Sequence, residues 1–374
     1  MSKLKGLSKW ELDTPCLVID LDKLKLNLKN MQDFAEKAGK KLRPHAKTHK
    51  CSIIAAMQMV SGSIGICAAK ISEAKALVKA GIKDILVTSP VVTDIKIKNL
   101  IECLALAPEL MLVVDNFDNA QKLNAVLKSV GLQLDVLVDI NPEMGRTGIS
   151  YAEAFGLGKF ISELSNLKLK GIQCYAGHIQ HMASYDARKK ASLEYLTKAA
   201  EVFRQFKAEK INVSIMTGTG TGTHDIDVLI PEITDLQVGS YAVMDTEYTD
   251  IGSAANPSTF DTFKPALTIL TSVVSTNQPH SFTVDAGLKA VYHLEKAPPK
   301  ILKPANKNWK YSWFGDEHGK ITVNNSSEKL PLGSVMEMTA SHCDPTINLH
   351  DTFYITKDDM VIDEWPIDLR GCCR

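Results

Sequence analysis

The sequence lacks any apolar run near the roughly 18 residues that a membrane-spanning helix needs. It also lacks an excess of charge of either sign, because Lys+Arg and Asp+Glu both total 43. A neutral chain gives no electrostatic reason to expect a nucleic acid or an anionic membrane surface as partner. We therefore expect a small-molecule substrate, with no nucleic-acid partner and no membrane partner.

Closely spaced cysteine pairs are also scarce. The eight cysteines are scattered, only Cys372 and Cys373 are adjacent, and no C-x-x-C pair is present. This pattern is typical of reduced thiols rather than of a disulfide scaffold. Residues 1–10 are polar and lysine-bearing, and no apolar segment resembling a secretory signal follows them. These features predict a cytoplasmic protein.

Short apolar runs alternate with longer amphipathic segments through the first two thirds of the chain. The runs are rich in Val, Ile and Leu, which is typical of buried parallel strands, and they cover 42–47, 64–68, 84–88, 110–115, 134–140, 169–175, 211–217 and 236–239. Helical spacing of apolar residues marks segments between them, at 22–38, 72–80, 118–130, 151–165 and 187–210. The last connection, at 225–231, has room only for a short helix.

This alternation predicts an α/β fold in which eight strand–helix units form a (β/α)8 TIM-type barrel. A doubly wound open sheet is the alternative. The barrel is favoured because polar motifs directly follow many of the strands, and barrel enzymes build their sites at that end of the strands. A chain of 374 residues also exceeds what one core usually supports, so a second domain is expected.

The pattern of residue types changes after about residue 256. Short β-branched runs appear at 266–275, 281–284, 320–323 and 352–355, separated by Pro, Gly and Asn. Residues 14–20 are also strand-like and are candidates to join this second region. We therefore expect a barrel over 20–255 and a mostly β domain built from 1–19 and 256–374.

Lys47 lies at the end of the first predicted strand, within Arg43-Pro44-His45-Ala46-Lys47-Thr48-His49-Lys50. A lysine there would point into the site of a barrel. Burial and neighbouring cations would lower its pKa, as an amine that forms a Schiff base requires. By itself the segment is better explained as a solvated basic loop.

Glycines follow the seventh and eighth predicted strands, in Thr217-Gly218-Thr219-Gly220-Thr221-Gly222-Thr223 and in Gly239-Ser240-Tyr241. Barrels commonly bind phosphate with these two loops, and glycine lets backbone N–H groups approach an anion. A flexible loop is the alternative for either glycine segment alone. The spacing does not fit a dinucleotide-binding fingerprint.

Other polar residues follow the fifth and sixth predicted strands. Arg146 lies between glycines in a turn, where its guanidinium could face a phenolate or a carboxylate, although a surface arginine is as plausible. Tyr175 is followed by His178 and His181, and two histidines suit acid–base chemistry near neutrality. One of the two histidines is plausibly structural.

His342 and Asp344 stand two residues apart in Ser341-His342-Cys343-Asp344-Pro345-Thr346. On a strand they would project from one face and Cys343 from the other. One imidazole and one carboxylate make an open site for a divalent cation. A turn whose polar groups are satisfied within the protein is the alternative.

Together these motifs resemble the fold-type III pyridoxal 5′-phosphate (PLP) enzymes, whose barrel is that of alanine racemase. Within that group the chain resembles the D-threonine aldolase and D-serine dehydratase branch, and most closely the aldolases. The motifs that carry the resemblance span almost the whole chain: Asp13-Thr14-Pro15, the Lys47 segment, Met144-Gly145-Arg146-Thr147-Gly148, Tyr175 through His181, Gly239-Ser240-Tyr241, Asp285-Ala286-Gly287, Glu317-His318-Gly319 and His342-Cys343-Asp344.

The resemblance implies that Lys47 holds PLP as a Schiff base, with Arg146 near the cofactor ring oxygen or the Lys47 side chain and Tyr175 near the pyridine ring. It places the cofactor phosphate within one set of residues: Thr219, Gly220, Thr221, Gly222, Gly239, Ser240 and Tyr241. Threonines at 219 and 221 interrupt a glycine run that is plainer in the family. His342 and Asp344 would hold a divalent metal.

The ligand set indicates the reaction. Dehydratases of this branch typically show His-x-Cys with zinc, whereas Asp344 is a hard donor that suits Mn²⁺ or Mg²⁺ better than Zn²⁺. We therefore expect an aldolase that cleaves D-β-hydroxy-α-amino acids of the D-threonine type, with His181 preferred over His178 as base. The alternatives are a 3-hydroxy-D-aspartate aldolase, a D-serine or 3-hydroxy-D-aspartate dehydratase, and a non-catalytic PLP carrier. The resemblance also implies a homodimer with shared active sites.

Overall fold

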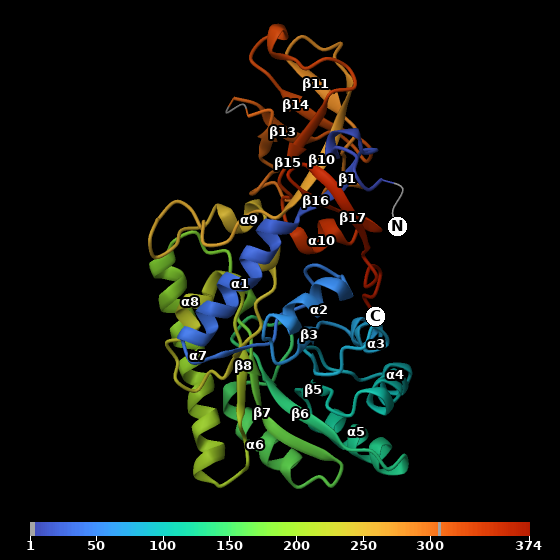
Figure 1. Ribbon diagram of the computed structural model, residues 1–374. Helices are drawn as coiled ribbons and strands as arrows, with labels where there is room; N and C mark the ends of the chain where they lie inside the picture. The colour runs from blue at the N-terminus through green and yellow to red at the C-terminus, as the bar shows by residue number, and fades with distance from the viewer. Residues whose placement is uncertain (1–3, 306–307) are drawn as a thin grey trace. The chain divides into compact units, whose positions relative to one another are not determined.

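The computed structural model describes residues 4–305 and 308–374, which divide into two compact units (Figure 1). The barrel unit comprises Met31–Lys47, Ser52–Gly239 and Gly371–Arg374. The β unit comprises the described part of Met1–Asn30 together with Thr48–Cys51 and Ser240–Arg370. Within the described ranges, no helix is both long and apolar enough to cross a membrane.

The barrel unit contains one sheet in which every pair of neighbouring strands is parallel. The strands occur in the spatial order β2-β9-β8-β7-β6-β5-β4-β3. Their bounds are β2 Lys41–Leu42, β3 Ile66–Ala68, β4 Ile85–Val87, β5 Met111–Val114, β6 Leu134–Ile140, β7 Leu167–Cys174, β8 Ile215–Gly218 and β9 Asp235–Leu236.

Backbone hydrogen bonds join the two ends of this sheet. Ile64 N–H donates to Leu42 O (2.8 Å), and Cys67 N–H donates to Pro44 O (2.8 Å). Ala46 N–H donates in return to Cys67 O (2.9 Å), and His45 forms a parallel bridge with Cys67. The sheet therefore closes on itself, which confirms the predicted barrel and excludes the doubly wound open sheet.

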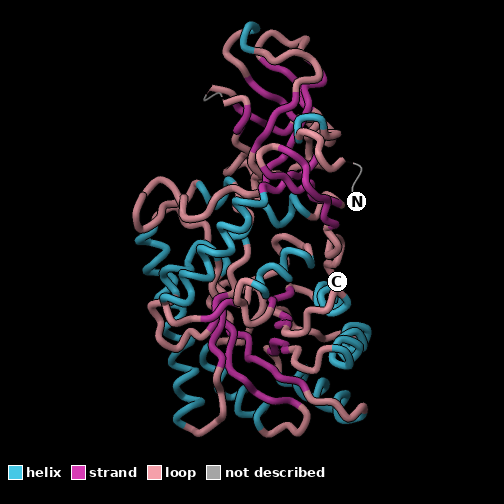
Figure 2. The backbone as a smooth tube through the Cα atoms, viewed as in Figure 1, coloured by secondary structure: helices cyan, strands magenta, loops and turns pink. Residues whose placement is uncertain are grey.

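Helices connect the strands and lie outside them in the barrel unit (Figure 2). Their inward faces follow helical spacing, as with the buried Leu196, Ala200 and Phe203 of α7. Side chains cap several helices, and Ser184 before α7 accepts from Ala187 N–H. The bounds are α2 Ser52–Val60, α3 Ile71–Lys79, α4 Asp94–Leu106, α5 Phe117–Ser129, α6 Tyr151–Ser162, α7 Tyr185–Ala208 and α8 His224–Asp227; α1 Leu21–Lys37 runs from the β unit into the barrel unit.

The β unit is built on a nine-stranded sheet whose central path is β13-β14-β11-β10-β1-β16-β17, with β15 joining β10 to β12. Strand β1 (Cys16–Asp20) lies between β10 and β16, antiparallel to β10 and parallel to β16. Strand β1, which lies within the run predicted at 14–20, thus pairs with strands from the second predicted region. The other strands are β10 Leu267–Ser275, β11 Ser281–Val284, β12 Ile301–Lys303, β13 Lys310–Trp313, β14 Gly319–Thr322, β15 Val335–Met338, β16 Thr352–Lys357 and β17 Met360–Pro366.

Short helices complete the β unit, and one of them corrects a prediction. His342 is not on a strand: it is the extended residue (φ −140°, ψ 128°) just before helix α10, Cys343–Ile347. Asp344 lies in the first turn, where the following Pro345 is tolerated because it needs no N–H partner. The argument that alternation along a strand aligns His342 with Asp344 and turns Cys343 away was therefore wrong. The other short helices are α9 Thr246–Thr249 and the 3₁₀ turns Lys9–Glu11, Ser240–Ala242 and Ser326–Glu328.

Candidate active site

In the barrel unit, two predicted site residues, Lys47 and Arg146, lie next to the aromatic ring of a third, Tyr175. Lys47 is half-buried in the turn that follows the His45 bridge. Its Nζ lies 5.7 Å from the centroid of the Tyr175 ring, and the Arg146 guanidinium carbon lies 5.4 Å from the same centroid. Cations at these distances are attracted to the face of an aromatic ring. Residues that are far apart in the sequence thus form a positively charged group next to an aromatic surface.

The loop that carries Arg146 is held firmly between β6 and α6. Asn141 Oδ1 accepts from the backbone N–H groups of residues 144 and 145, and Gly148 N–H donates to Asp115 Oδ2 (3.0 Å). Thr147 Oγ1 donates to Asp139 Oδ2 (2.9 Å). Gly148 has φ +98°, and a Cβ there would lie 2.4 Å from Asn141 N, so the turn requires glycine. Arg146 is therefore presented on a preformed turn.

A buried polar network, which the sequence analysis did not identify, crosses the barrel. Gln173 Nε2 donates to Asp139 Oδ1 (2.9 Å), and Gln237 Nε2 donates to Gln173 Oε1 (3.1 Å). His45 Nε2 lies 3.1 Å from Thr88 Oγ1. Burial raises the pKa of Asp139 to about 6, although hydrogen bonds from Gln173 and Thr147 oppose that shift. These residues come from five different strands or strand ends, so only the closed barrel brings them together.

The predicted phosphate residues fall on both sides of the boundary between the units. Thr219, Gly220, Thr221 and Gly222 follow β8 in the barrel unit, and Thr219 has φ +72°, an unusual conformation for a β-branched residue. Gly239 ends the barrel unit, whereas Ser240 and Tyr241 begin the next part of the β unit. The Tyr241 ring is buried against Phe263, with 5.7 Å between the centroids.

The two candidate histidines differ in their surroundings. His178 is exposed in the 3₁₀ turn Gly177–Ile179, and its ring centroid lies 5.3 Å from that of Tyr195 on α7. His181 is half-buried just beyond that turn. The ring contact with Tyr195 packs His178 against α7. The choice of His181 over His178 as the base stays a prediction.

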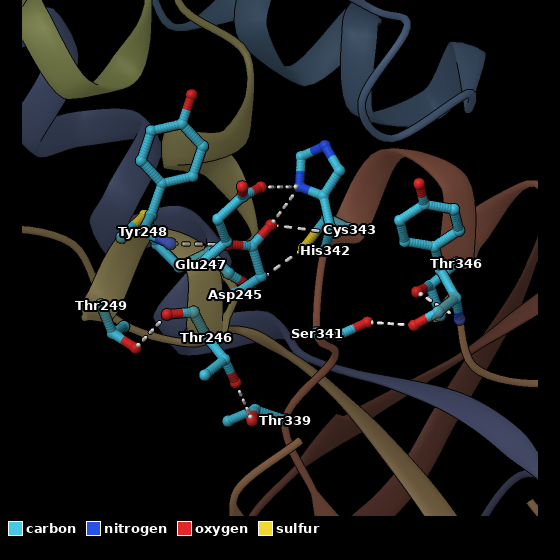
Figure 3. Close-up of polar contacts among 12 residues, drawn as sticks. Asp245, Thr246, Glu247, Tyr248, Thr249, Thr339, Ser341, His342, Cys343 and Thr346 are labelled. Carbon is cyan, nitrogen blue, oxygen red and sulfur yellow. Dashed lines mark hydrogen bonds and ion pairs between the residues drawn. The ribbon is translucent and has the colours of Figure 1, made fainter. Parts of the chain in front are cut away.

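His342 lies in a cluster of acidic side chains in the β unit (Figure 3). Its Nδ1 is 2.9 Å from Asp245 Oδ2 and 3.4 Å from Glu247 Oε2, and Asp245 Oδ2 also accepts from Cys343 N–H (2.8 Å). Burial alone would lower the pKa of His342, but the hydrogen bond to Asp245 and the charges of Asp344, Asp245 and Glu247 raise it to about 9. The carboxylates of Asp245 and Glu247 therefore favour the protonated imidazole and hold it through Nδ1.

Asp245 and Glu247 were missed by the sequence analysis. Asp245 is 97 positions from His342, and no local motif links the two. Within residues 4–305 and 308–374, no group of three or more His, Cys, Asp or Glu side chains is arranged to hold a metal ion. The donor chemistry nevertheless suits a hard cation, because carboxylates surround the imidazole. Burial raises the pKa of the Cys343 thiol well above its usual range, and its Sγ donates to Met244 O (3.0 Å), so a thiolate ligand is disfavoured.

Comparisons with known proteins match the chain along almost its whole length. The alanine racemase N-terminal domain family matches residues 19–245, and the putative serine dehydratase domain family matches residues 266–356. A D-threonine aldolase from Arthrobacter sp is 35% identical over 97% of this chain and 94% of that protein. The crystal structure of D-threonine aldolase from Filomicrobium marinum matches with a TM-score of 0.93, at 32% identity, and the match covers 99% of both chains.

This chain belongs to the alanine racemase-like family that includes the D-threonine aldolases.

Within the family, the chain is more similar to aldolases than to a dehydratase. A 3-hydroxy-D-aspartate aldolase from Paracoccus denitrificans (strain Pd 1222) is 34% identical over 98% of this chain and 95% of that protein. A D-threo-3-hydroxyaspartate dehydratase from Delftia sp. (strain HT23) is 25% identical over 75% of this chain and 73% of that protein. The family therefore agrees with the resemblance that the motifs indicated.

Proposed function

We propose that this chain is a PLP- and divalent-metal-dependent aldolase. It cleaves D-β-hydroxy-α-amino acids of the D-threonine and D-allo-threonine type into glycine and an aldehyde. The observation that carries the proposal is the placement of Lys47 and Arg146 against the Tyr175 ring, which suits an anionic aromatic cofactor attached to an amine. The high coverage of the aldolase relatives supports the choice of reaction.

The residues of the barrel unit fit PLP by their chemistry. Lys47 supplies the amine, Arg146 a guanidinium on a preformed turn for the ring oxygen, and Tyr175 an aromatic surface for the pyridine ring. The phosphate is assigned to the Gly–Thr loop after β8, together with Gly239, Ser240 and Tyr241. When bound, PLP supplies an electron sink for the electron pair that the broken bond leaves on Cα.

His181 is the proposed base. It accepts the proton of the substrate β-hydroxyl, and the oxygen's electron pair then forms the carbonyl of the departing aldehyde. The Cα–Cβ bond breaks in the same step, and Cα takes up a proton to give glycine. A neutral imidazole is suited to this transfer near neutral pH, because the ordinary pKa of histidine is close to that pH.

His342 and Asp344 are the proposed metal ligands, with water and substrate oxygens as the remaining donors. Asp245 orients the imidazole through Nδ1, and Nε2 would be the nitrogen that binds the ion. A divalent ion held there would lower the pKa of the β-hydroxyl. Mn²⁺ or Mg²⁺ suits this set better than Zn²⁺, since Cys343 is a buried thiol.

Further assignments rest on the resemblance, for the homodimer, and on the sequence, for the domain bounds and the location. We propose a homodimer in which the β unit of each copy completes the partner's site, with the barrel domain taken as 20–255. We also propose a cytoplasmic location, which the eight free cysteines support.

Product analysis tests the reaction. The enzyme is incubated with D-threonine, PLP and Mn²⁺, with L-threonine as the stereochemical control. Glycine and acetaldehyde are expected; 2-oxobutanoate and ammonia would instead identify a dehydratase. The same assay with 3-hydroxy-D-aspartate tests the second candidate substrate, which the Paracoccus relative favours, and there glycine and glyoxylate are the expected products.

A further inference from the structure

Two loops of the barrel unit are joined by the side chain of Gln180. The histidine loop (175–182) follows β7, and the Gly–Thr loop (217–223) comprises the last two residues of β8 and the turn after it. Gln180 Oε1 accepts from Gly222 N–H (3.1 Å), while its Nε2 donates to Thr223 Oγ1 (3.0 Å) and to Ala176 O (3.3 Å). The side chain is 1% exposed, so these bonds are shielded from water. One buried amide therefore contacts both loops.

Two glycines of the Gly–Thr loop, Gly220 and Gly222, are required by Gln180. A Cβ on Gly220 would lie 2.3 Å from Gln180 Oε1, and a Cβ on Gly222 would lie 2.1 Å from Gln180 O. Neither position has room for a side chain. Because Gly222 N–H donates to Gln180, it is not oriented for an anion. Gly222 is therefore a residue of the loop contact, and the donors for a phosphate come from the rest of the loop.

Arg188 joins the same two loops from α7. Its Nε donates to Gly222 O (2.7 Å), and its Nη1 donates to Met182 O. The side chain is 0% exposed. A guanidinium is costly to bury unless its N–H groups are bonded, so this arrangement fixes both carbonyls firmly. Gln180 and Arg188 thus hold Gly222 by its N–H and its carbonyl.

We propose that Gln180 and Arg188 are positioning residues that make the two loops move as one body, so that a phosphate bound at the Gly–Thr loop also fixes the loop of His178 and His181. The roles of the phosphate and of the histidines rest on the proposed function; the mechanical coupling does not. Ordering one loop reduces the conformational freedom that the other has left to lose, which is how two sites become coupled without a large movement.

Hydrogen exchange on the full-length chain, with and without inorganic phosphate, tests the coupling. In the natural protein, phosphate should slow amide exchange in both loops. In Gln180→Met, which keeps the volume and removes the amide, phosphate should protect only the Gly–Thr loop. Protection of both loops in the variant, or of one loop or neither in the natural protein, would overturn the proposal.

Gln58→Met is the matched control, because Gln58 is a buried glutamine on α2 of the same unit. It should leave the phosphate response of both loops unchanged. If Gln180→Met does not fold, Arg188→Lys provides the second variant, since lysine lacks the fork that reaches both carbonyls. It should uncouple the loops in the same way, and coupled protection in that variant would contradict the proposal.

Kinetics separate this inference from the proposed function. With saturating PLP, Gln180→Met should lower kcat for D-threonine cleavage by about tenfold, with a smaller effect on KM, because the base loses its position rather than the substrate its contacts. If the natural protein releases no glycine, the proposed function fails, while the exchange measurement still decides whether the loops are coupled.

Discussion

Asp227 should make the stability of the barrel unit depend on pH in the direction opposite to an ordinary carboxylate. It lies at the end of α8, where it accepts from Ser192 Oγ and from Thr223 Oγ1. Burial raises the pKa of Asp227 to about 7, although the hydrogen bonds from Ser192 and Thr223 oppose the shift. In an unfolded chain the pKa would be about 3.9.

The direction in which the free energy of unfolding changes with pH follows from proton binding. Between about pH 4 and pH 7 the folded chain keeps the Asp227 proton that the unfolded chain has lost, so raising the pH lowers the free energy of unfolding. From pH 5.5 to pH 8 this amounts to about 2 kcal/mol, at about 1.36 kcal/mol for each unit up to pH 7. Asp227→Asn resembles the protonated form and should abolish the loss.

Thermal unfolding at pH 5.5 and pH 8 measures the effect. The difference in Tm between Asp227→Asn and the natural protein should grow in favour of the variant by about 4–8 °C on going to pH 8, for a unit of this size. Asp186→Asn is the matched control, because Asp186 is exposed on the neighbouring helix α7. A difference that stays constant with pH, or that grows toward acid pH, would refute the reasoning.

Three further predictions concern the site. Thr147→Val removes the hydroxyl that donates to Asp139, so the Arg146 loop loses an anchor; PLP titration and kinetics should show about tenfold weaker cofactor binding and lower kcat, and unchanged values would contradict this. Tyr175→Ala should lower kcat/KM more than tenfold but Tyr175→Phe only about threefold, because the ring rather than the hydroxyl makes the cation contacts. His342→Ala should abolish Mn²⁺ binding measured by electron paramagnetic resonance, whereas His280→Ala, at an exposed histidine of the β unit, should retain it; equal binding by both variants would remove His342 from the metal site.

Where local pattern decides the structure, the sequence predicts it closely. Strands β6 and β11 have the predicted bounds, because each is an apolar run that turn or polar residues delimit. The prediction of the first barrel strand, at 42–47, was less accurate. Only Lys41–Leu42 is regular strand, and Lys47 lies in a turn beyond it. No helix was predicted at α2 or α4. The apolar residues of α2 are nearly continuous and hide the helical period, and α4 begins with an alternation of Ile and Lys that is typical of strands.

The site was predictable where it lies in motifs, and not where it depends on closure of the fold. Lys47, Arg146 and Tyr175 each belong to a recognisable segment, and the barrel brings them together. Asp139 and Gln173 are single polar residues within apolar strands, and their partners are defined only by the closed barrel. The error at His342 had a local cause, since the Asp344-Pro345 pair that favours the first turn of a helix was taken as part of a strand.

Gln180 shows a different limit. Its side chain explains the glycine at 220 and its backbone carbonyl the glycine at 222, which by themselves suggested only an anion site. A glycine pattern indicates that the backbone is approached closely, but it does not say by what. Here the approaching group is the Gln180 side chain at Gly220 and the Gln180 backbone carbonyl at Gly222.

The most direct test of the account is the identity of the lysine that carries the cofactor. The enzyme loaded with PLP is reduced with borohydride, which makes the link between a lysine and the cofactor permanent, and its peptides are then mapped by mass spectrometry. We predict phosphopyridoxyl on Lys47 and none on the nearby Lys50, with the label absent from that peptide in Lys47→Ala. A label on another lysine of the natural protein, or no labelled peptide, would contradict the central claim.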